Sequence, residues 1–166
     1  MAPAQASLLA KLDTQERVRD FLTNAVASGR ASHAYLFLGA PGAGKLDAAW
    51  ALAQAFLCEQ DGCGSCDSCV RVARHTHPDV HYYTPESATG YLIAQTRELL
   101  DDVPLAPIRA KAKVYIIDRA EQLRANTANA LLKTLEEPPE GVMFILLGTS
   151  ADVMSVSYTH LTLPTK

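Results

Sequence analysis

The sequence predicts an α/β fold, with a parallel β-sheet covered by helices on both faces, for this chain of 166 residues. Three observations predict it. Short apolar runs typical of buried strands alternate with segments of helical periodicity. A glycine-rich loop ends in Gly-Lys after the first strand, and an aspartate closes a later strand. Ligands of such sheets bind beyond the carboxyl ends of the strands, so both features belong at one end of the sheet.

The first predicted elements are a helix and a buried strand. Residues 15–27 carry apolar side chains at helical spacing, and Gly29 ends the helix. The run 34–38 is apolar throughout and predicts the strand. His33, just before this strand, could approach a nucleotide, but an ordinary loop histidine is the favoured interpretation.

The loop after this strand has the sequence Gly-Ala-Pro-Gly-Ala-Gly-Lys, and residues 46–58 behind it have the spacing of a helix. Strand, glycine loop, Gly-Lys and helix together form the context of a phosphate-binding P-loop. In such a loop the backbone N–H groups point inward, the helix N-terminus adds partial positive charge, and the lysine reaches the outer phosphates. The residues predicted to bind phosphate are Gly39, Gly42, Gly44 and Lys45.

The pattern departs from a complete P-loop at the next residue. A Ser or Thr normally follows the lysine because its hydroxyl holds Mg²⁺, whereas this chain has Leu46. The loop therefore keeps a cradle for phosphate but has lost one metal ligand. The alternative is a glycine loop that merely turns the chain, and the flanking strand and helix argue against it.

All four cysteines fall between residues 58 and 69, with the spacing Cys-x4-Cys-x2-Cys-x2-Cys. Four thiolates this close suit a closed tetrahedral zinc site, which is structural because no position is open for water. Iron–sulfur ferredoxins have a similar spacing, but their next ligand lies downstream before a proline. Paired disulfides are rare in a cytoplasmic chain. The predicted zinc ligands are Cys58, Cys63, Cys66 and Cys69.

Beyond the cysteines, residues 80–83 predict a short strand and residues 93–101 a helix. The side chains expected to face inward from this helix are Ile93, Thr96, Leu99 and Leu100. A basic connector follows, and a charge run of this kind is usually a solvated turn. Its members are Arg109, Lys111 and Lys113.

The apolar run 114–117 predicts a buried strand that ends in Asp118. In P-loop NTPases the aspartate at this place holds Mg²⁺, and a glutamate often follows it and orients the attacking water. Here Arg119 follows, and Glu121, two positions further, is not expected to point the same way. The alternative role for Asp118 is a helix N-cap.

The last predicted helix and strand complete the pattern. Residues 126–136 carry an apolar stripe at helical spacing, and the dipeptide Pro138-Pro139 stops the helix. Residues 142–149 predict another buried strand. Its polar last residue, Thr149, lies where a nucleotide sensor could sit.

The composition is that of a globular protein, with 48% hydrophobic and 20% charged residues. The formal net charge of −3 argues against a chain that coats nucleic acid. No apolar run reaches the roughly 18 residues that a membrane helix needs, and the N-terminus lacks the features of a signal peptide. We therefore expect a cytoplasmic protein without a membrane partner.

Six motifs, in this order, resemble the clamp-loader subunits of bacterial DNA polymerase III, in particular the delta-prime branch. They are His33–Phe37, the P-loop, the four-cysteine insertion, His77–Val80, Lys113–Asp118 and Asn129–Pro139. The last of them is highly specific for clamp-loader subunits. The resemblance covers residues 12–152 and implies a AAA+ nucleotide-binding domain over residues 1–154, with the zinc module 58–69 inserted in it.

The resemblance implies a subunit that helps to load the ring-shaped sliding clamp onto primed DNA, together with gamma/tau and delta subunits. The gamma/tau motor keeps Ser or Thr and then Glu at the two places where this chain has Leu46 and Arg119. A stator with a degenerate ATP site is therefore favoured, with structural zinc as its cofactor and no catalytic residue of its own. The alternative is a motor ATPase that uses Lys45 and Asp118. A zinc-centred nucleic-acid-binding module is the weakest interpretation, because the net charge is negative.

The family pattern continues past Thr149 to a Ser-Arg-Cys motif, whose arginine reaches a neighbouring subunit's ATP site, and then to lid and collar domains. This chain instead continues into Ser155–Lys166, of which Ser155–Thr165 matches one reading frame of a transposase adapter used in DNA sequencing. A natural strand is the rival interpretation, but neither of its alternating faces is consistently apolar. We expect this tail to be foreign to the gene, and the motif, lid and collar to lie in its missing continuation.

Overall fold

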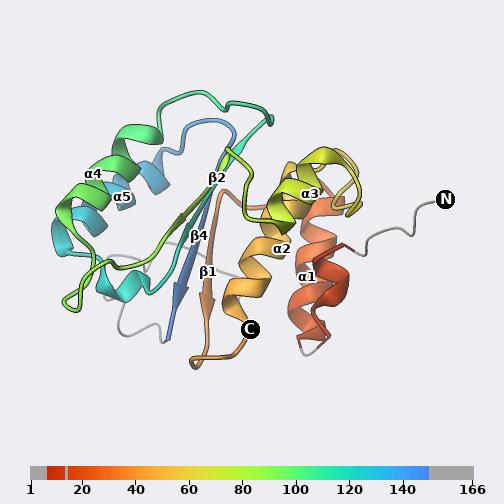
Figure 1. The fold of residues 1–166 in the computed structure, drawn as a ribbon, viewed down its shortest axis with the longest axis horizontal. Coiled ribbons are helices and arrows are strands. Elements are labelled where there is room, and N and C mark those ends of the chain that lie inside the picture. Colours follow the sequence, from red (N-terminus) through yellow and green to blue (C-terminus); the bar gives the residue numbers. More distant parts are fainter. Residues whose placement is uncertain (1–6, 14, 150–166) are drawn as a thin grey trace.

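A four-stranded parallel sheet forms the middle layer of the protein (Figure 1). The computed structural model describes residues 7–13 and 15–149, so the tail predicted to be foreign lies outside the described residues. The strands lie in the order β1-β4-β3-β2. Their bounds are β1 (Ala34–Leu38), β2 (Val80–Tyr83), β3 (Lys113–Ile117) and β4 (Val142–Gly148).

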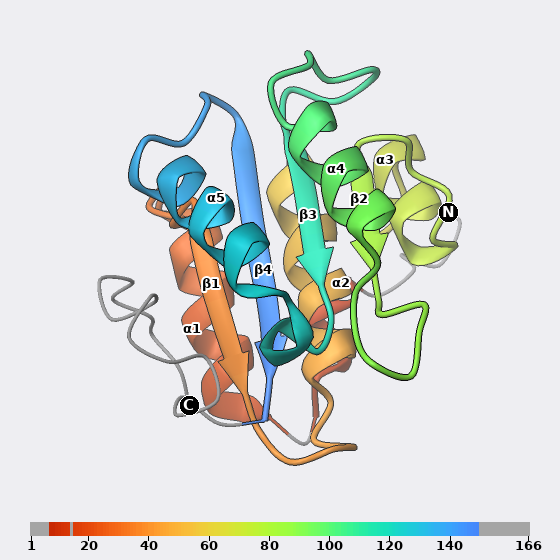
Figure 2. The same ribbon diagram turned by 90° about the vertical axis from the view of Figure 1, so that its left-hand side faces the viewer.

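Helices cover both faces of this sheet, as the sequence predicts (Figures 1 and 2). On one side lie α1 (Glu16–Ala27) and α2 (Lys45–Leu57), with α3 (Asp67–Ala73) packed against α2. On the other side lie α4 (Ile93–Asp102) and α5 (Ala125–Glu136). Short 3-10 turns, η1 (Leu9–Lys11) and η2 (Ala120–Gln122), precede α1 and α5. None of the helices in the described part of the chain is long and apolar enough to cross a membrane.

Each face of the sheet carries its own apolar core, because successive residues of a strand point to opposite sides. On β3, Val114 and Ile116 face α2, whereas Tyr115 and Ile117 face α4 and α5. The central strands β3 and β4 are buried along their whole length. That is why they appear in the sequence as continuous apolar runs rather than alternating ones.

Helix α2 is buried almost all round, because its alanines let it approach the sheet closely. The segment Ala48–Ala55 is buried at every position. One polar side chain lies within it: Gln54, which is 2% exposed. Its Oε1 accepts the N–H of Leu8 at 2.9 Å, and its amide donates to the carbonyl oxygen of Cys69 at 3.1 Å. Gln54 therefore joins the N-terminal segment and the cysteine module to α2.

The expectation that Ile93 faces inward is wrong, because this side chain is 53% exposed at the first position of α4. Gln95 takes the inward place instead. Its amide donates to the carbonyl oxygen of Thr84 at 2.8 Å, and its Oε1 accepts the N–H of Leu92 at 2.9 Å. The predicted inward positions Thr96 and Leu99 are buried.

The expectation of a solvated turn is also wrong for Lys113, which is the first residue of β3 and only 2% exposed. Its ammonium donates to the carbonyl oxygen of Asp102 and lies 3.4 Å from the carboxylate of the same residue. Tyr115 and His81 also bond to that carboxylate. A buried lysine needs partners of this kind, because an isolated buried charge is very unfavourable.

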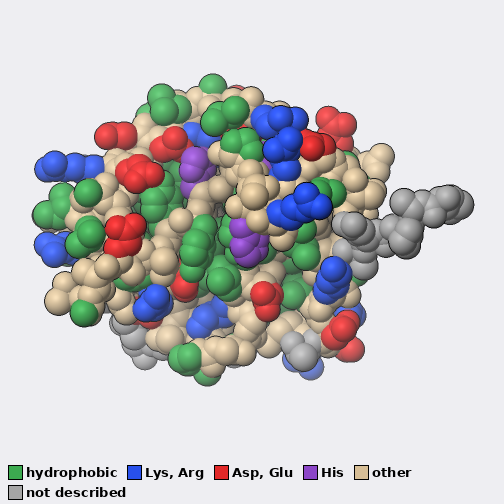
Figure 3. All heavy atoms as spheres, in the orientation of Figure 1, with side chains coloured by type: hydrophobic (Ala, Val, Ile, Leu, Met, Phe, Trp, Pro, Cys, Tyr) green, Lys and Arg blue, Asp and Glu red, His purple; other side chains and the backbone are tan. Residues whose placement is uncertain are grey.

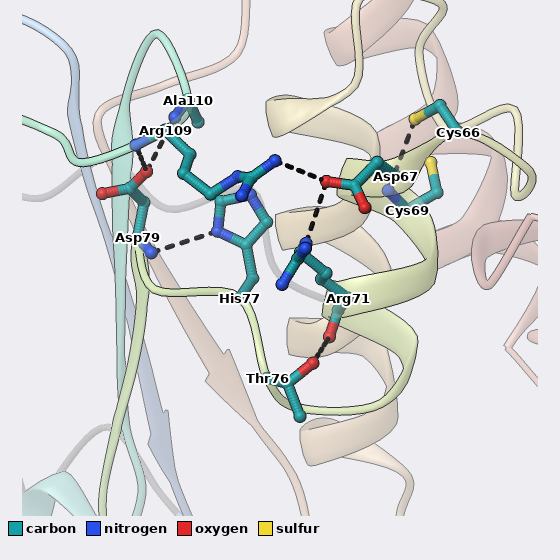
Figure 4. A network of polar contacts seen from close by, with 9 residues as sticks. All are labelled: Cys66, Asp67, Cys69, Arg71, Thr76, His77, Asp79, Arg109 and Ala110. Carbon is teal, nitrogen blue, oxygen red and sulfur yellow. Dashed lines mark hydrogen bonds and ion pairs between the residues drawn. The ribbon is translucent and has the colours of Figure 1, made fainter.

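The rest of the basic connector is held by one buried carboxylate, that of Asp79 (Figure 4). Its oxygens accept three consecutive backbone N–H groups, from Ile108 at 2.6 Å and from Arg109 and Ala110 at 2.7 Å. The Arg109 guanidinium reaches Asp67 on α3 at 3.0 Å. The connector is therefore fixed both to the start of β2 and to the cysteine module.

Charge on the surface is mixed in sign. Acidic and basic side chains are interspersed over the face shown in Figure 3, in keeping with the net charge of −3. The buried carboxylate of Asp79, in contrast, is compensated by its hydrogen-bond donors. Burial alone would raise the pKa of Asp79, but its three N–H donors outweigh burial and lower the pKa below the ordinary value.

We expect Asp79→Asn to lower the free energy of unfolding by about 2–3 kcal/mol at pH 7, because an amide would replace the charged acceptor of three N–H groups. The lowered pKa also fixes the pH dependence. The contribution of Asp79 is complete above the ordinary carboxyl pKa of about 3.9 and is lost as the pH falls through the folded-state pKa. Urea unfolding from pH 7 to pH 3 should therefore show the difference from wild type shrinking in acid.

The matched control is Asp101→Asn, which changes an exposed aspartate on α4 and should leave stability unchanged. An Asp79→Asn protein as stable as wild type at pH 7 would contradict this account of the connector.

Candidate nucleotide pocket and metal centre

A pocket of about 440 Å³ lies where β1, β3 and β4 end, at the edge that the sequence predicts. It brings together five of the six residues predicted to contact a nucleotide. Gly39 is not among the lining residues, although its carbonyl oxygen accepts a hydrogen bond from Lys45. The lining residues are Pro41, Gly42, Ala43, Gly44, Lys45, Leu46, Asp47, Asp118, Arg119, Glu121, Leu147 and Thr149.

The P-loop owes its shape to two glycines in the left-handed region, Gly42 at φ +82° and Gly44 at φ +85°. A side chain is strained in this conformation, which glycine adopts freely. Gly44 is also the N-cap of α2, so the N-terminus of that helix borders the pocket. The Lys45 ammonium donates to the carbonyl oxygens of Gly39 and Ala40 and thus lies against its own loop.

Leu46 lines the pocket at the place of the metal-binding hydroxyl, and it also packs against the core between α2 and the sheet. An aliphatic side chain offers no oxygen to Mg²⁺, which requires hard oxygen ligands. The oxygen-bearing side chains in the described lining are Asp47, Asp118, Glu121 and Thr149.

The Asp118 carboxylate accepts a hydrogen bond on each oxygen. The Tyr82 hydroxyl donates to Oδ2 at 3.0 Å, and the backbone N–H of Arg119 donates to Oδ1 at 2.9 Å. Burial and this bond both raise the pKa of Tyr82 above its usual value. The Tyr91 hydroxyl lies within hydrogen-bond distance of two carbonyl oxygens, those of Asp118 and Tyr83, which share its one proton. Asp118 makes no N-cap bond to η2, so that alternative role is not supported.

Arg119 turns the chain sharply, because it is one of the few non-glycine residues in the left-handed region, at φ +46°. Its guanidinium donates to the Thr84 hydroxyl at 3.0 Å. The short helix η2 follows this turn, and its Glu121 is among the residues that line the pocket. Its Oε2 is buried and has no hydrogen-bond partner in the part of the chain that the structure describes.

His33 behaves as the ordinary loop histidine that the sequence favours. Its Nε2 bonds to the carbonyl oxygen of Leu135 at the end of α5, at 3.0 Å. It therefore ties α5 to the beginning of β1, and it is not among the residues that line the pocket.

The four cysteines form a compact cluster whose sulfur atoms all lie within 4.8 Å of one another. Three of the Sγ to Sγ distances are 3.7, 3.8 and 4.0 Å, for the pairs Cys58–Cys63, Cys58–Cys66 and Cys63–Cys69. A tetrahedral ion with sulfur ligands at about 2.3 Å separates them by about 3.8 Å. The cluster therefore fits a four-sulfur metal site, and all four cysteines are free thiols rather than disulfides.

Backbone N–H groups point at the sulfurs and favour the thiolate form that metals bind. The N–H of Cys66 reaches the sulfur of Cys63 at 3.4 Å, and the N–H of Cys69 reaches the sulfur of Cys66 at 3.4 Å. Hydrogen bonds from the backbone and side chain of Ser65 lower the pKa of Cys63 to about 6. Burial raises the pKa of the Cys69 thiol.

The cysteine module is connected to the sheet through Asp67, the first residue of α3 (Figure 4). Its Oδ2 accepts from Arg71 at 2.8 Å within the helix and from Arg109 on the connector at 3.0 Å. His77 lies between these groups and the sheet, with its Nδ1 accepting the N–H of Asp79 at 3.0 Å. The sequence gives no sign of this network, because it depends on three separate segments meeting.

A parallel sheet with a P-loop after its first strand and an acidic residue after the strand β3 defines a P-loop domain of the AAA+ class. Solved structures share this fold. A gamma subunit-related DNA polymerase III protein from Thermotoga maritima has a TM-score of 0.53 at 20% identity, over 78% of this chain and 38% of that one. A point mutant of RuvB from Thermotoga maritima has a TM-score of 0.52 at 18% identity, over 93% and 45% of the two chains.

Residues 14–156 match the sequence profile of the family described as DNA polymerase III, delta subunit, and the chain belongs to that family. It is 41% identical over 138 residues to DNA polymerase III subunit delta' of Bacillus subtilis, covering 81% of this chain and 42% of that protein. It is 42% identical over 147 residues to DNA polymerase III subunit tau of Escherichia coli, covering 86% of this chain and 23% of that protein. The chain thus spans less than half the length of these relatives.

The turn before Tyr91 supports Asp118, and it depends on Gly90. A Cβ at Gly90, where φ is +121°, would lie 2.8 Å from the carbonyl oxygen of Gln122. We expect Gly90→Ala to cost about 2–4 kcal/mol of unfolding free energy, from backbone strain and this clash together. The measurement is chemical denaturation.

Gly29→Ala is the matched control for Gly90→Ala, because Gly29 has φ +69° but nothing within 4 Å of its Cβ position. Gly29→Ala should lower the free energy of unfolding by about 1 kcal/mol, which is the backbone strain of an alanine in the left-handed region. Equal losses in the two variants would mean that the contact with η2 contributes nothing.

Proposed function

We propose that this chain is the AAA+ domain of a clamp-loader subunit of DNA polymerase III, acting as a stator with a degenerate ATP site. Membership of the delta-subunit family supports a place in that polymerase. The observation that carries the stator role is the make-up of the pocket. It keeps a phosphate cradle and Asp118 but has Leu46 and Arg119 in place of the metal-binding hydroxyl and the water-orienting carboxylate.

In this proposal residues 1–154 form the nucleotide-binding-like domain, and lid and collar domains belong to the rest of the protein. The partners are the gamma/tau and delta subunits, with the sliding clamp and primed DNA reached through the assembled complex in the cytoplasm. The names of the similar proteins support the subunit partners, since they are delta' and tau subunits. A stator needs a rigid P-loop domain more than it needs turnover.

We further propose that the metal of the four-cysteine site is a single structural Zn²⁺. The four sulfurs complete a tetrahedral ligand set, which suits zinc and leaves no position for water or substrate. The ion would hold the loop 58–66 and the start of α3 together. Its effect should therefore appear in stability rather than in nucleotide binding.

The second candidate function is a motor ATPase of the gamma/tau type. Two observations favour it: Glu121 lines the pocket with a buried, unpartnered oxygen, and the chain is 42% identical to a tau subunit. In that case Glu121 would orient water in place of the glutamate missing after Asp118. Leu46 argues against it, because hydrolysis also requires a held Mg²⁺.

Turnover separates the two functions. For the stator we expect no ATP hydrolysis above background, since the loss of a general base alone typically lowers a rate by about 10²–10⁴. Leu46→Thr should improve Mg²⁺-dependent nucleotide affinity more than rate. Phosphate release from purified protein is the measurement, with Glu121→Gln as the diagnostic variant. Robust turnover that Glu121→Gln abolishes would establish the motor and contradict the stator.

Elemental analysis tests the metal, and we expect one zinc ion per chain. Cys66→Ser should lower the Tm by about 5 °C or more, because binding of the metal is coupled to local folding. Ser68→Ala is the matched control, since this side chain lies between two ligands and its hydroxyl has no partner among the described residues. Absence of zinc, or the visible absorption of an iron–sulfur cluster, would overturn the proposal.

A further inference from the structure

We propose that Tyr82 makes the P-loop pocket a metal-independent phosphate site, because its phenol holds the Asp118 carboxylate that a divalent cation would otherwise use. The ligand class is a nucleotide polyphosphate without its Mg²⁺. This inference rests on the proposed degenerate nucleotide site. It adds the reason why that site would bind a nucleotide without its metal ion.

Mg²⁺ does not fit the pocket as a P-loop normally holds it. The usual protein ligands are the hydroxyl after the lysine and the aspartate after the later strand. The first is replaced by Leu46, and both oxygens of the second, Asp118, accept hydrogen bonds. A cation that approached Oδ2 would have to compete with the Tyr82 hydroxyl.

The Tyr82 ring is well supported in this position. Tyr82 lies on β2, the edge strand, in register with Ile116 of β3, and its hydroxyl reaches Asp118 just beyond the end of β3. The ring centroid lies 6.1 Å from that of Trp50 on α2. Trp50 in turn stacks on His75 at 3.9 Å and 11°. Trp50 and His75 therefore help to position the Tyr82 phenol toward Asp118.

The other contacts around Asp118 favour the same arrangement. Its backbone carbonyl accepts from Tyr91, and Arg119 donates its N–H to Oδ1 and its guanidinium to Thr84. The carboxylate thus lies between donors from two sides, and rotation toward a cation would break both the Tyr82 and the Arg119 bonds. These bonds are made to a charged acceptor, which makes them stronger than neutral ones.

Positive charge for a phosphate chain is present without a metal. Both Lys45 and Arg119 line the pocket, and in the described part of the chain neither forms an ion pair with a carboxylate. Among the described residues, the Arg119 guanidinium donates to the neutral hydroxyl of Thr84, and the Lys45 ammonium donates to carbonyl oxygens. Both charges, with the N-terminus of α2, can therefore face a polyphosphate directly.

The experiment is a calorimetric titration with ATP in Mg²⁺-free buffer and in excess Mg²⁺. The variants are Tyr82→Phe and, as the matched control, Tyr83→Phe. Tyr83 is the next residue of β2, faces the opposite core, and makes no side-chain bond to Asp118. We expect wild type and Tyr83→Phe to bind ATP equally in both buffers. Tyr82→Phe should bind about 10-fold more tightly with Mg²⁺ than without it, because the carboxylate is released.

A double variant, Leu46→Thr with Tyr82→Phe, strengthens the test. The double variant supplies a hydroxyl and also frees the aspartate. The factor by which Mg²⁺ tightens its binding of ATP should therefore exceed the product of the factors for the two single variants. Thermal unfolding of each variant checks that the fold is intact, and because Tyr82 is 39% exposed its loss of one hydroxyl should be tolerated.

Three results would overturn the inference: wild type that requires Mg²⁺ to bind ATP, wild type that binds ATP in neither buffer, or Tyr82→Phe that behaves like Tyr83→Phe. None of them contradicts the stator, which needs no nucleotide. ATP turnover by wild type, in contrast, contradicts the stator whatever the metal dependence of binding, so the two failures are distinguishable.

Discussion

The close packing of α2 on the sheet is the constraint on which both sites depend. The helix begins at Lys45, directly behind the P-loop, and ends at Leu57, directly before the first cysteine. Alanines keep its axis close to β3 and β4, and the segment Ala48–Ala55 has no exposed position. A larger side chain there would push the helix away and move the P-loop at one end and the cysteine cluster at the other.

The same packing explains how the P-loop tolerates its departure from the usual pattern. A hydroxyl after the lysine serves only a bound metal, whereas Leu46 packs against the core beneath α2. An apolar side chain at this position exchanges a metal ligand for burial of apolar surface, worth about 25 cal/mol per Å². The basic side chains in the described lining of the pocket are those of Lys45 and Arg119.

The sequence predicts the strands, and it predicts which residues gather at the pocket and in the cysteine cluster, because these features are local. Strands β1 and β2 have the predicted bounds, and the spacing of glycines and cysteines gives the P-loop and the cluster. The failures involve partners distant in sequence. Lys113 is buried because the carbonyl oxygen of Asp102 accepts a hydrogen bond from its ammonium. Glu121 lines the pocket after the left-handed turn at Arg119. Tyr82 has no motif of its own, since its role depends on the register of β2 with β3.

The edge strand β2 lies between the cysteine module and the pocket along the chain. Asp79 ends the loop from the cysteine module and fixes the connector, and β2 begins at the next residue, Val80. Tyr82, two residues later, holds the aspartate of the pocket. Asp67 follows the third cysteine of the cluster and bonds to Arg109, and Asp79 holds the connector directly before β2 starts. Strand β2, which is only four residues long, thus links the residue that holds the connector to the residue that donates to Asp118.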